Sequence, residues 1–141
     1  MVSRVFVDTS VLLAHIDADD PRHEAVRQEF AAHGEDELVT HGYVVAETLA
    51  VARRRFGVEG VIAVLDDLLP AIVILAVEPS LHATAQGRYR ASLPSGTSFV
   101  DQVSFAVIER DAIETAFALD PDFAAAGIAV VPAWPTRPHT A

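Results

Sequence analysis

Short runs of β-branched and apolar residues alternate with longer amphipathic stretches along the chain. The short runs predict strands over 4–8, 38–40, 71–77, 113–119 and 128–131. The longer stretches have the apolar spacing of helices and predict them over 11–17, 21–32, 43–56, 59–69, 80–93 and 99–110, with a loop or helical turn over 120–127. This alternation is typical of the α/β class, so we expect a three-layer α/β/α sandwich with a mostly parallel central sheet.

Proline and glycine set several of the expected boundaries. Pro21 lies at an early position of the second predicted helix, Gly57 ends the third, and Pro70 stops the fourth. We expect a single domain over 1–131, followed by a proline-rich tail over 132–141 that runs over the surface.

Composition narrows the classes of protein to consider. Of 141 residues, 51% are hydrophobic, which is enough to build one core. The absence of cysteine excludes disulfides, thiolate nucleophiles and cysteine-based zinc sites, and it suits a reducing compartment, so we expect a cytoplasmic protein. The most apolar stretch, 61–77, is interrupted by Asp66, Asp67 and Pro70, so we expect no membrane span.

The charge points away from a simple basic binding surface. The formal net charge is −10, opposite in sign to that of most non-specific nucleic-acid binders, but it suits an acidic site neutralised by divalent cations. All ten basic side chains are arginines, so no lysine is available for catalysis or phosphate binding. Residues 53–55, and the pair 88 and 90, are candidates for RNA phosphate contacts, although neither group forms one compact helix face.

Four acidic residues stand where the local pattern does not require them: Asp8, Glu47, Asp101 and Asp120. Asp8 and Asp120 end strands, Glu47 lies early in the helix after the second strand, and Asp101 lies in the first turn of the helix before the fourth strand. In a parallel sheet all four meet at the carboxyl edge, where open α/β sheets bind ligands. Carboxylates so close together need compensation, which Mg²⁺ or Mn²⁺ supplies. Such a site is suited to phosphodiester hydrolysis.

Each position also has a purely structural interpretation. Asp8 is a favoured helix cap, Ser98 and Asp101 have the spacing of a capping box, and the acids beside Pro121 suit a turn. Glu47 is harder to explain in this way, because a carboxylate among apolar residues needs a partner.

These residues resemble PIN-domain proteins, in particular the VapC-like toxins. The segments that carry the resemblance are Phe6-Val7-Asp8-Thr9-Ser10, Val44-Val45-Ala46-Glu47, Thr97-Ser98-Phe99-Val100-Asp101, and Leu119-Asp120-Pro121-Asp122-Phe123 with Gly127. The resemblance implies a Mg²⁺- or Mn²⁺-dependent endoribonuclease, the toxin of a type II toxin–antitoxin pair. It also implies an RNA substrate, a cognate antitoxin and a homodimer.

Carried over by position, the resemblance assigns the site residues. Asp8, Glu47 and Asp101 would be metal-binding acids, and Asp120 the fourth, with Asp122 as a competing candidate. Supporting side chains would be the hydroxyls of Thr9 or Ser10, and Ser98.

Three other functions compete with this interpretation. A phosphorelay receiver is expected to carry a functional lysine, which this chain lacks. A hydrolase with an aspartyl nucleophile usually has a second aspartate two residues on, where this chain has Ser10. The third is a catalytically inactive PIN-fold protein that binds RNA or a protein partner, whose binding should survive removal of metal.

Overall fold

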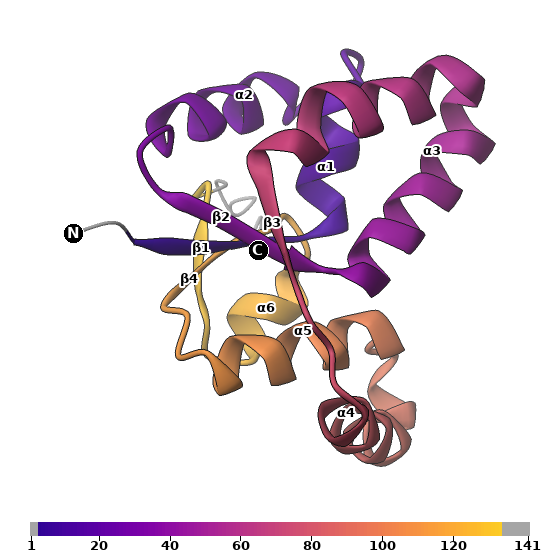
Figure 1. Ribbon diagram of the computed structural model, residues 1–141, viewed down its shortest axis with the longest axis vertical. Helices are drawn as coiled ribbons and strands as arrows, with labels where there is room; N and C mark the ends of the chain where they lie inside the picture. Colours follow the sequence, from indigo (N-terminus) through magenta and orange to yellow (C-terminus); the bar gives the residue numbers. More distant parts are fainter. Residues whose placement is uncertain (1–2, 134–141) are drawn as a thin grey trace, which may run out of the picture.

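The computed structural model describes residues 3–133, which form three layers (Figure 1). The central layer is a sheet of five strands: β1 (Arg4–Val7), β2 (Glu37–His41), β3 (Ile72–Leu75), β4 (Thr115–Phe117) and β5 (Ala129–Val131). Their order is β3-β2-β1-β4-β5, and every neighbouring pair is parallel. The predicted α/β class is therefore confirmed, with a sheet that is parallel throughout.

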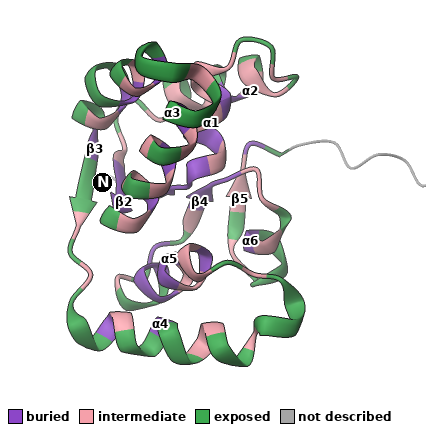
Figure 2. Ribbon diagram, turned by 90° about the vertical axis from the view of Figure 1, so that its right-hand side faces the viewer, coloured by how far each residue is buried: buried purple, intermediate pink, exposed green. Residues whose placement is uncertain are grey.

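Helices cover both faces of the sheet (Figures 1 and 2). One face carries α1 (Thr9–Ile16), α2 (His23–Ala32) and α3 (Gly42–Ala63), which continues into the short turns η1 (Val64–Leu68) and η2 (Leu69–Ala71). The other carries α4 (Pro79–Ala91), η3 (Leu93–Ser95), α5 (Phe99–Arg110) and α6 (Pro121–Ala125). The two sets of helices lie on opposite faces because every crossover is right-handed and the direction along the sheet changes. The chain first moves from β1 through β2 to β3, and then returns past β1 to β4. The strand order thus reverses between β1 and β4, where such sheets bind ligands.

The core is built from the apolar residues of the strands and the inner helix faces. Phe6 of β1, Phe117 of β4 and Phe123 of α6 are fully buried. The Phe123 ring stacks on Phe6 with centroids 6.2 Å apart and meets the edge of Phe105 of α5 at 5.0 Å. The short helix α6 is therefore anchored to the sheet by its aromatic residue.

The starts of the first two helices differ from the prediction. Helix α1 begins two residues earlier than expected, because Asp8 ends β1 and caps the helix. Helix α2 begins at His23, so the prediction that Pro21 is helical was wrong. The residue after it, Arg22, is held in a turn, where its N–H donates to Asp20 Oδ1 at 2.8 Å and its guanidinium pairs with the same oxygen at 3.2 Å.

Gly57 separates two helical stretches within α3. Residues 43–56 and 59–69 were expected as separate helices, and the backbone is non-helical at Gly57, with φ of 70° and ψ of −157°, so the expected break is confirmed as a sharp kink in one continuous element. Elsewhere the predicted helix over 99–110 agrees with α5, whereas β3 and β4 are shorter than the predicted strands over 71–77 and 113–119.

The end of the chain leaves one prediction open. Residue 131 ends β5, and residues 134–141 of the expected tail lie outside the described residues. Within residues 3–133, no helix combines the length and apolar character needed to cross a membrane.

Candidate active site

A pocket of about 380 Å³ opens at the carboxyl edge of the sheet, where β1 and β4 lie side by side. Helices α1, α3, α5 and α6 surround this edge (Figure 2). The pocket is lined by Asp8, Thr9, Ser10, Leu13, Glu47, Val51, Gly96, Ser98, Asp101, Asp120 and Asp122. The structure thus brings together all five acids and all three hydroxyl residues singled out from the sequence.

Asp8 is the most deeply buried of the acids, with 4% of its surface exposed. Its backbone N–H donates to the Phe117 carbonyl at 3.0 Å, which extends the pairing of β1 with β4 by one residue. Burial raises the pKa of the Asp8 carboxyl to about 6; hydrogen bonds from Ser10 oppose this rise, and the charge of Asp120 adds to it. Asp8 is therefore both the cap of α1 and a carboxylate that is costly to ionise.

The two hydroxyls after Asp8 have different partners. Ser10 Oγ donates to Asp8 Oδ2 at 2.6 Å and accepts the backbone N–H of Leu119 at 2.9 Å. Thr9 points toward α3, where its hydroxyl donates to the Val44 carbonyl at 3.5 Å and accepts from Thr48 at 3.2 Å. Ser10 thus orients the acid, and Thr9 fixes α1 against α3. The part played by Thr48 was not predicted, because a threonine inside a helix gives no local sign of such a contact.

Asp101 lies in the first turn of α5, with 8% of its surface exposed. Ser98 caps the helix, since its Oγ accepts the Asp101 N–H at 3.0 Å. The pKa of Asp101 is raised to about 7, mainly by burial and also by the nearby charges of Asp8 and Asp120, while hydrogen bonds with Ser98 oppose the rise. The structural interpretation of this pair is correct, yet the same geometry also presents the carboxylate to the pocket.

Asp120 and Asp122 both reach the site from α6. Asp120 caps the helix, its Oδ1 accepting the Asp122 N–H at 2.9 Å, and both side chains are half-buried. One carboxylate oxygen from each of Asp101, Asp120 and Asp122 lies within 4.8 Å of the other two. Either α6 acid is therefore close enough to share a ligand with Asp101.

Glu47 completes the pocket from α3. It lies in the second turn of that helix, is half-buried, and lines the pocket together with Val51 one turn further on. Like Asp8, it lies outside the close group of three oxygens but in the same pocket.

The carboxylates lack positive partners of their own. None of the five acids forms an ion pair with another residue in the part of the chain that the structure describes. Burial and mutual repulsion raise the pKa of two of them, so the ionised site needs a cation. A donor set made of carboxylate oxygens fits a hard divalent cation such as Mg²⁺ or Mn²⁺.

A buried histidine connects two of the helices that carry the acids of the site. His41 is fully buried and caps α3, its Nδ1 accepting the N–H groups of Tyr43 at 3.2 Å and Val44 at 3.4 Å. Its proton must then lie on Nε2, which donates to Ser104 Oγ of α5 at 2.8 Å, since the Ser104 hydroxyl itself donates to the Val100 carbonyl. His41 thus links the helices that carry Glu47 and Asp101. This role could not be predicted from the sequence, because histidine is not among the usual capping residues.

Comparison with known proteins agrees with this architecture. Residues 5–129 match the family model described as the PIN domain. The chain belongs to the PIN-domain family. This PIN domain is 33% identical over 128 residues to the 23S rRNA-specific endonuclease VapC20 of Mycobacterium tuberculosis, covering 90% of the chain and 97% of that protein. It is also 44% identical over 64 residues to ribonuclease VapC26 of the same organism, which is 45% of the chain and 47% of that protein.

Solved structures show the same fold. The crystal structure of M. tuberculosis VapC20, described as a sarcin–ricin loop cleaving toxin, has a TM-score of 0.79 and 31% identity, covering 88% of this PIN domain and 95% of that chain. VapBC2 of Rickettsia felis has a TM-score of 0.67 at 12% identity, covering 90% of the PIN domain and 96% of that chain. The likeness to VapC20 thus extends from sequence to structure, and the likeness to VapBC2 concerns the fold alone.

Proposed function

We propose that this PIN domain is a divalent-metal-dependent endoribonuclease that hydrolyses RNA phosphodiester bonds, and that it is the toxin of a VapBC-like toxin–antitoxin pair. The observation that carries the proposal is the pocket itself. Five carboxylates from four separate segments line it, none has an ion-pair partner within residues 3–133, and two have a raised pKa. A protein that only binds RNA or a partner gains nothing from holding such charges together.

The five acids differ in how close their carboxylate oxygens lie to one another. Asp101, Asp120 and Asp122 have the oxygens close enough to hold a Mg²⁺ or Mn²⁺ ion, with Asp8 and Glu47 in the same pocket. A cation held there supplies activation of water and charge stabilisation during in-line displacement at phosphorus.

The surrounding residues keep these carboxylates in place. Ser10 orients Asp8, Ser98 fixes the turn that carries Asp101, and Phe123 anchors α6. Positioning of this kind is what makes a metal site effective, because misplaced ligands lose affinity and activity.

The substrate proposal follows from the likeness to VapC20 described above. VapC20 is described as 23S rRNA-specific and as cleaving the sarcin–ricin loop, and this PIN domain covers 97% of that protein at 33% identity. We therefore propose the sarcin–ricin loop of 23S rRNA as the first substrate to test. A cognate antitoxin, a homodimer and a cytoplasmic location belong to the same proposal.

The decisive experiment is cleavage of ribosomal RNA by the purified protein with Mg²⁺ or Mn²⁺, with and without EDTA. Asp101→Asn keeps the size of the side chain but removes its charge, and Asp66→Asn, an exposed acid on η1, is the matched control. We expect discrete cleavage by wild type and Asp66→Asn, and none with EDTA or Asp101→Asn. RNA binding without cleavage, unchanged by EDTA, would instead identify an inactive binding module.

A further inference from the structure

The arginines of this protein differ in whether they form ion pairs with acidic side chains. Nine of the ten lie in residues 3–133, and six of these form ion pairs: Arg4, Arg22, Arg27, Arg55, Arg88 and Arg110. Arg53, Arg54 and Arg90 form none with another described residue. Among the arginines that the structure describes in this chain of net charge −10, these three are the ones whose charge is available to an anionic ligand.

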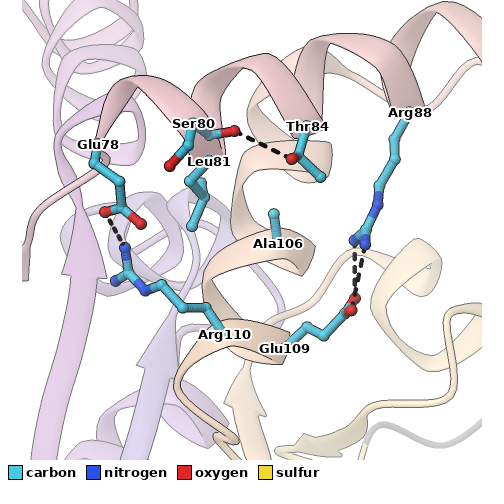
Figure 3. Close-up of a pocket in the computed structure, with 8 residues that line it drawn as sticks. All are labelled: Glu78, Ser80, Leu81, Thr84, Arg88, Ala106, Glu109 and Arg110. Atoms are coloured by element: carbon cyan, nitrogen blue, oxygen red, sulfur yellow. Dashed lines mark hydrogen bonds and ion pairs between the residues drawn. The ribbon is translucent and has the colours of Figure 1, made fainter.

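Arg88 and Arg90 on α4 show the contrast most clearly. Figure 3 shows Arg88 reaching from α4 to Glu109 of α5, where two hydrogen bonds of 2.9 and 3.3 Å join the side chains. Arg90 follows two residues later, about 200° further around the helix, and therefore projects away from α5. It is exposed, whereas Arg88 is half-buried.

Gly87 lies beside Arg90 in the interior of the same helix. A Cβ atom added at Gly87 would meet no atom within 4 Å, and its φ is not positive. Neither packing nor backbone conformation therefore requires glycine here, although glycine weakens a helix relative to alanine. Glycine is suited to a position where the backbone of another molecule approaches closely.

The surface of α4 is hollowed around these residues, and the chain leads from there to the acidic pocket. Two shallow depressions share Gly87, Arg90 and Leu93, and Leu93 is 52% exposed. Leu93 opens η3, and Gly96, three residues later, lines the acidic pocket. Consecutive Cα atoms are about 3.8 Å apart, so the Cα atoms of Leu93, which lines the depressions, and Gly96, which lines the pocket, lie at most about 11 Å apart.

We propose that Arg90 binds a phosphate of the RNA segment flanking the cleaved bond, and that Gly87 leaves room for the sugar–phosphate backbone beside Leu93. The proposal rests on the proposed endoribonuclease function and assigns part of its substrate path. RNA is the occupant that the charges favour, because an arginine with no ion pair to another described residue gains most from a ligand that carries a phosphate at each step.

The test compares Arg90→Gln with Arg88→Gln, which removes the same charge from the same helix. Both are made in the Asp101→Asn protein, and binding of a fluorescent RNA hairpin of mixed sequence is measured by anisotropy across a salt series. We expect Arg90→Gln to weaken binding roughly three- to fivefold at physiological salt and to reduce the slope of log K against log salt by about 1. Arg88→Gln should change neither.

Gly87→Ala gives a second test, in which stability and RNA binding should change in opposite directions. The alanine should raise the melting temperature by about 3 °C and yet weaken RNA binding and slow cleavage, because its methyl group occupies the RNA path. Equal RNA binding by Arg90→Gln and Arg88→Gln would overturn the assignment while leaving a cleaving wild type intact. A change in self-association alone would also overturn it, in favour of an interface between copies. If wild type neither binds nor cleaves RNA, the proposed function fails as well.

Discussion

The hydroxyl oxygen of Ser10 lies 2.6 Å from Oδ2 of Asp8. The same oxygen accepts the backbone N–H of Leu119 at 2.9 Å, 109 positions further along the chain. One small side chain therefore holds both the most buried acid of the pocket and the segment that leads from β4 to α6.

Ser10→Ala should disturb both contacts. It removes a hydrogen bond to Asp8 and leaves the Leu119 N–H without its partner, which should cost about 1–3 kcal/mol of unfolding free energy. Because Asp8 loses its orientation, we expect RNA cleavage to fall about tenfold or more. Chemical denaturation and cleavage assays measure the two effects, and Ser10→Thr, which keeps the hydroxyl, should recover most of each. Wild-type behaviour of Ser10→Ala would contradict this role.

Asp101 should make the metal-free protein less stable as the pH rises. Its pKa is about 7 in the folded protein against an ordinary value of 3.8, so the native state keeps a proton that the unfolded chain releases. Stability is therefore lost between about pH 4 and pH 7. Asp101→Asn removes this dependence, and its unfolding free energy relative to wild type should rise by on the order of 1–2 kcal/mol over that range. Urea denaturation in EDTA at several pH values measures this difference in unfolding free energy. A difference that stays constant with pH would contradict the prediction.

Metal binding should depend on pH in the opposite direction. At pH 5.5 the carboxyls of Asp8 and Asp101 are largely protonated, since their pKa values are about 6 and about 7, and a cation must displace those protons. Mg²⁺ or Mn²⁺ should therefore raise the melting temperature more at pH 8 than at pH 5.5, and RNA cleavage should increase over the same range. Asp101→Asn should lose most of the metal-induced shift. Equal shifts at both pH values in wild type would argue against these ligands.

His41 should make the protein sensitive to acid. Burial, with a smaller contribution from the charge of Arg110, lowers the pKa of His41 to about 4. Below pH 6.5 the unfolded chain takes up a proton that the native state excludes, so stability is lost as the pH falls toward 4. His41→Asn keeps a capping side chain without a titrating ring, and wild type should lose about 2 kcal/mol relative to it between pH 7 and pH 4.5. Parallel stability curves would show that His41 titrates normally.

A side chain at position 57 should destabilise the folded protein. Its φ of 70° and ψ of −157° lie in a region that is essentially restricted to glycine, so Gly57→Ala should cost about 1–3 kcal/mol. Gly42→Ala is the matched control, since that glycine has open space around it and no positive φ. Thermal denaturation should show a clear loss for the first variant and little change for the second. If the two behave alike, the kink does not depend on glycine.

The sequence predicted the convergence of the acids better than the details around them. Asp8 and Asp120 follow short apolar runs, and parallel topology alone brings the ends of those strands together. The contact of Ser10 with Leu119 could not be predicted, because the register of two distant segments determines it. The capping role of His41 also depends on tertiary packing, since Ser104 comes from a helix on the opposite face of the sheet.

The order of the pocket residues along the chain has a consequence for synthesis. The acids lie at positions 8, 47, 101, 120 and 122, and Phe123, which anchors the last two, follows directly. A ribosome-bound chain that has not yet released residues 115–123 has neither α6 nor β4, the strand that pairs with the end of β1. The pocket therefore assembles only after residue 123 has left the ribosome, and a product truncated before that residue lacks the assembled site.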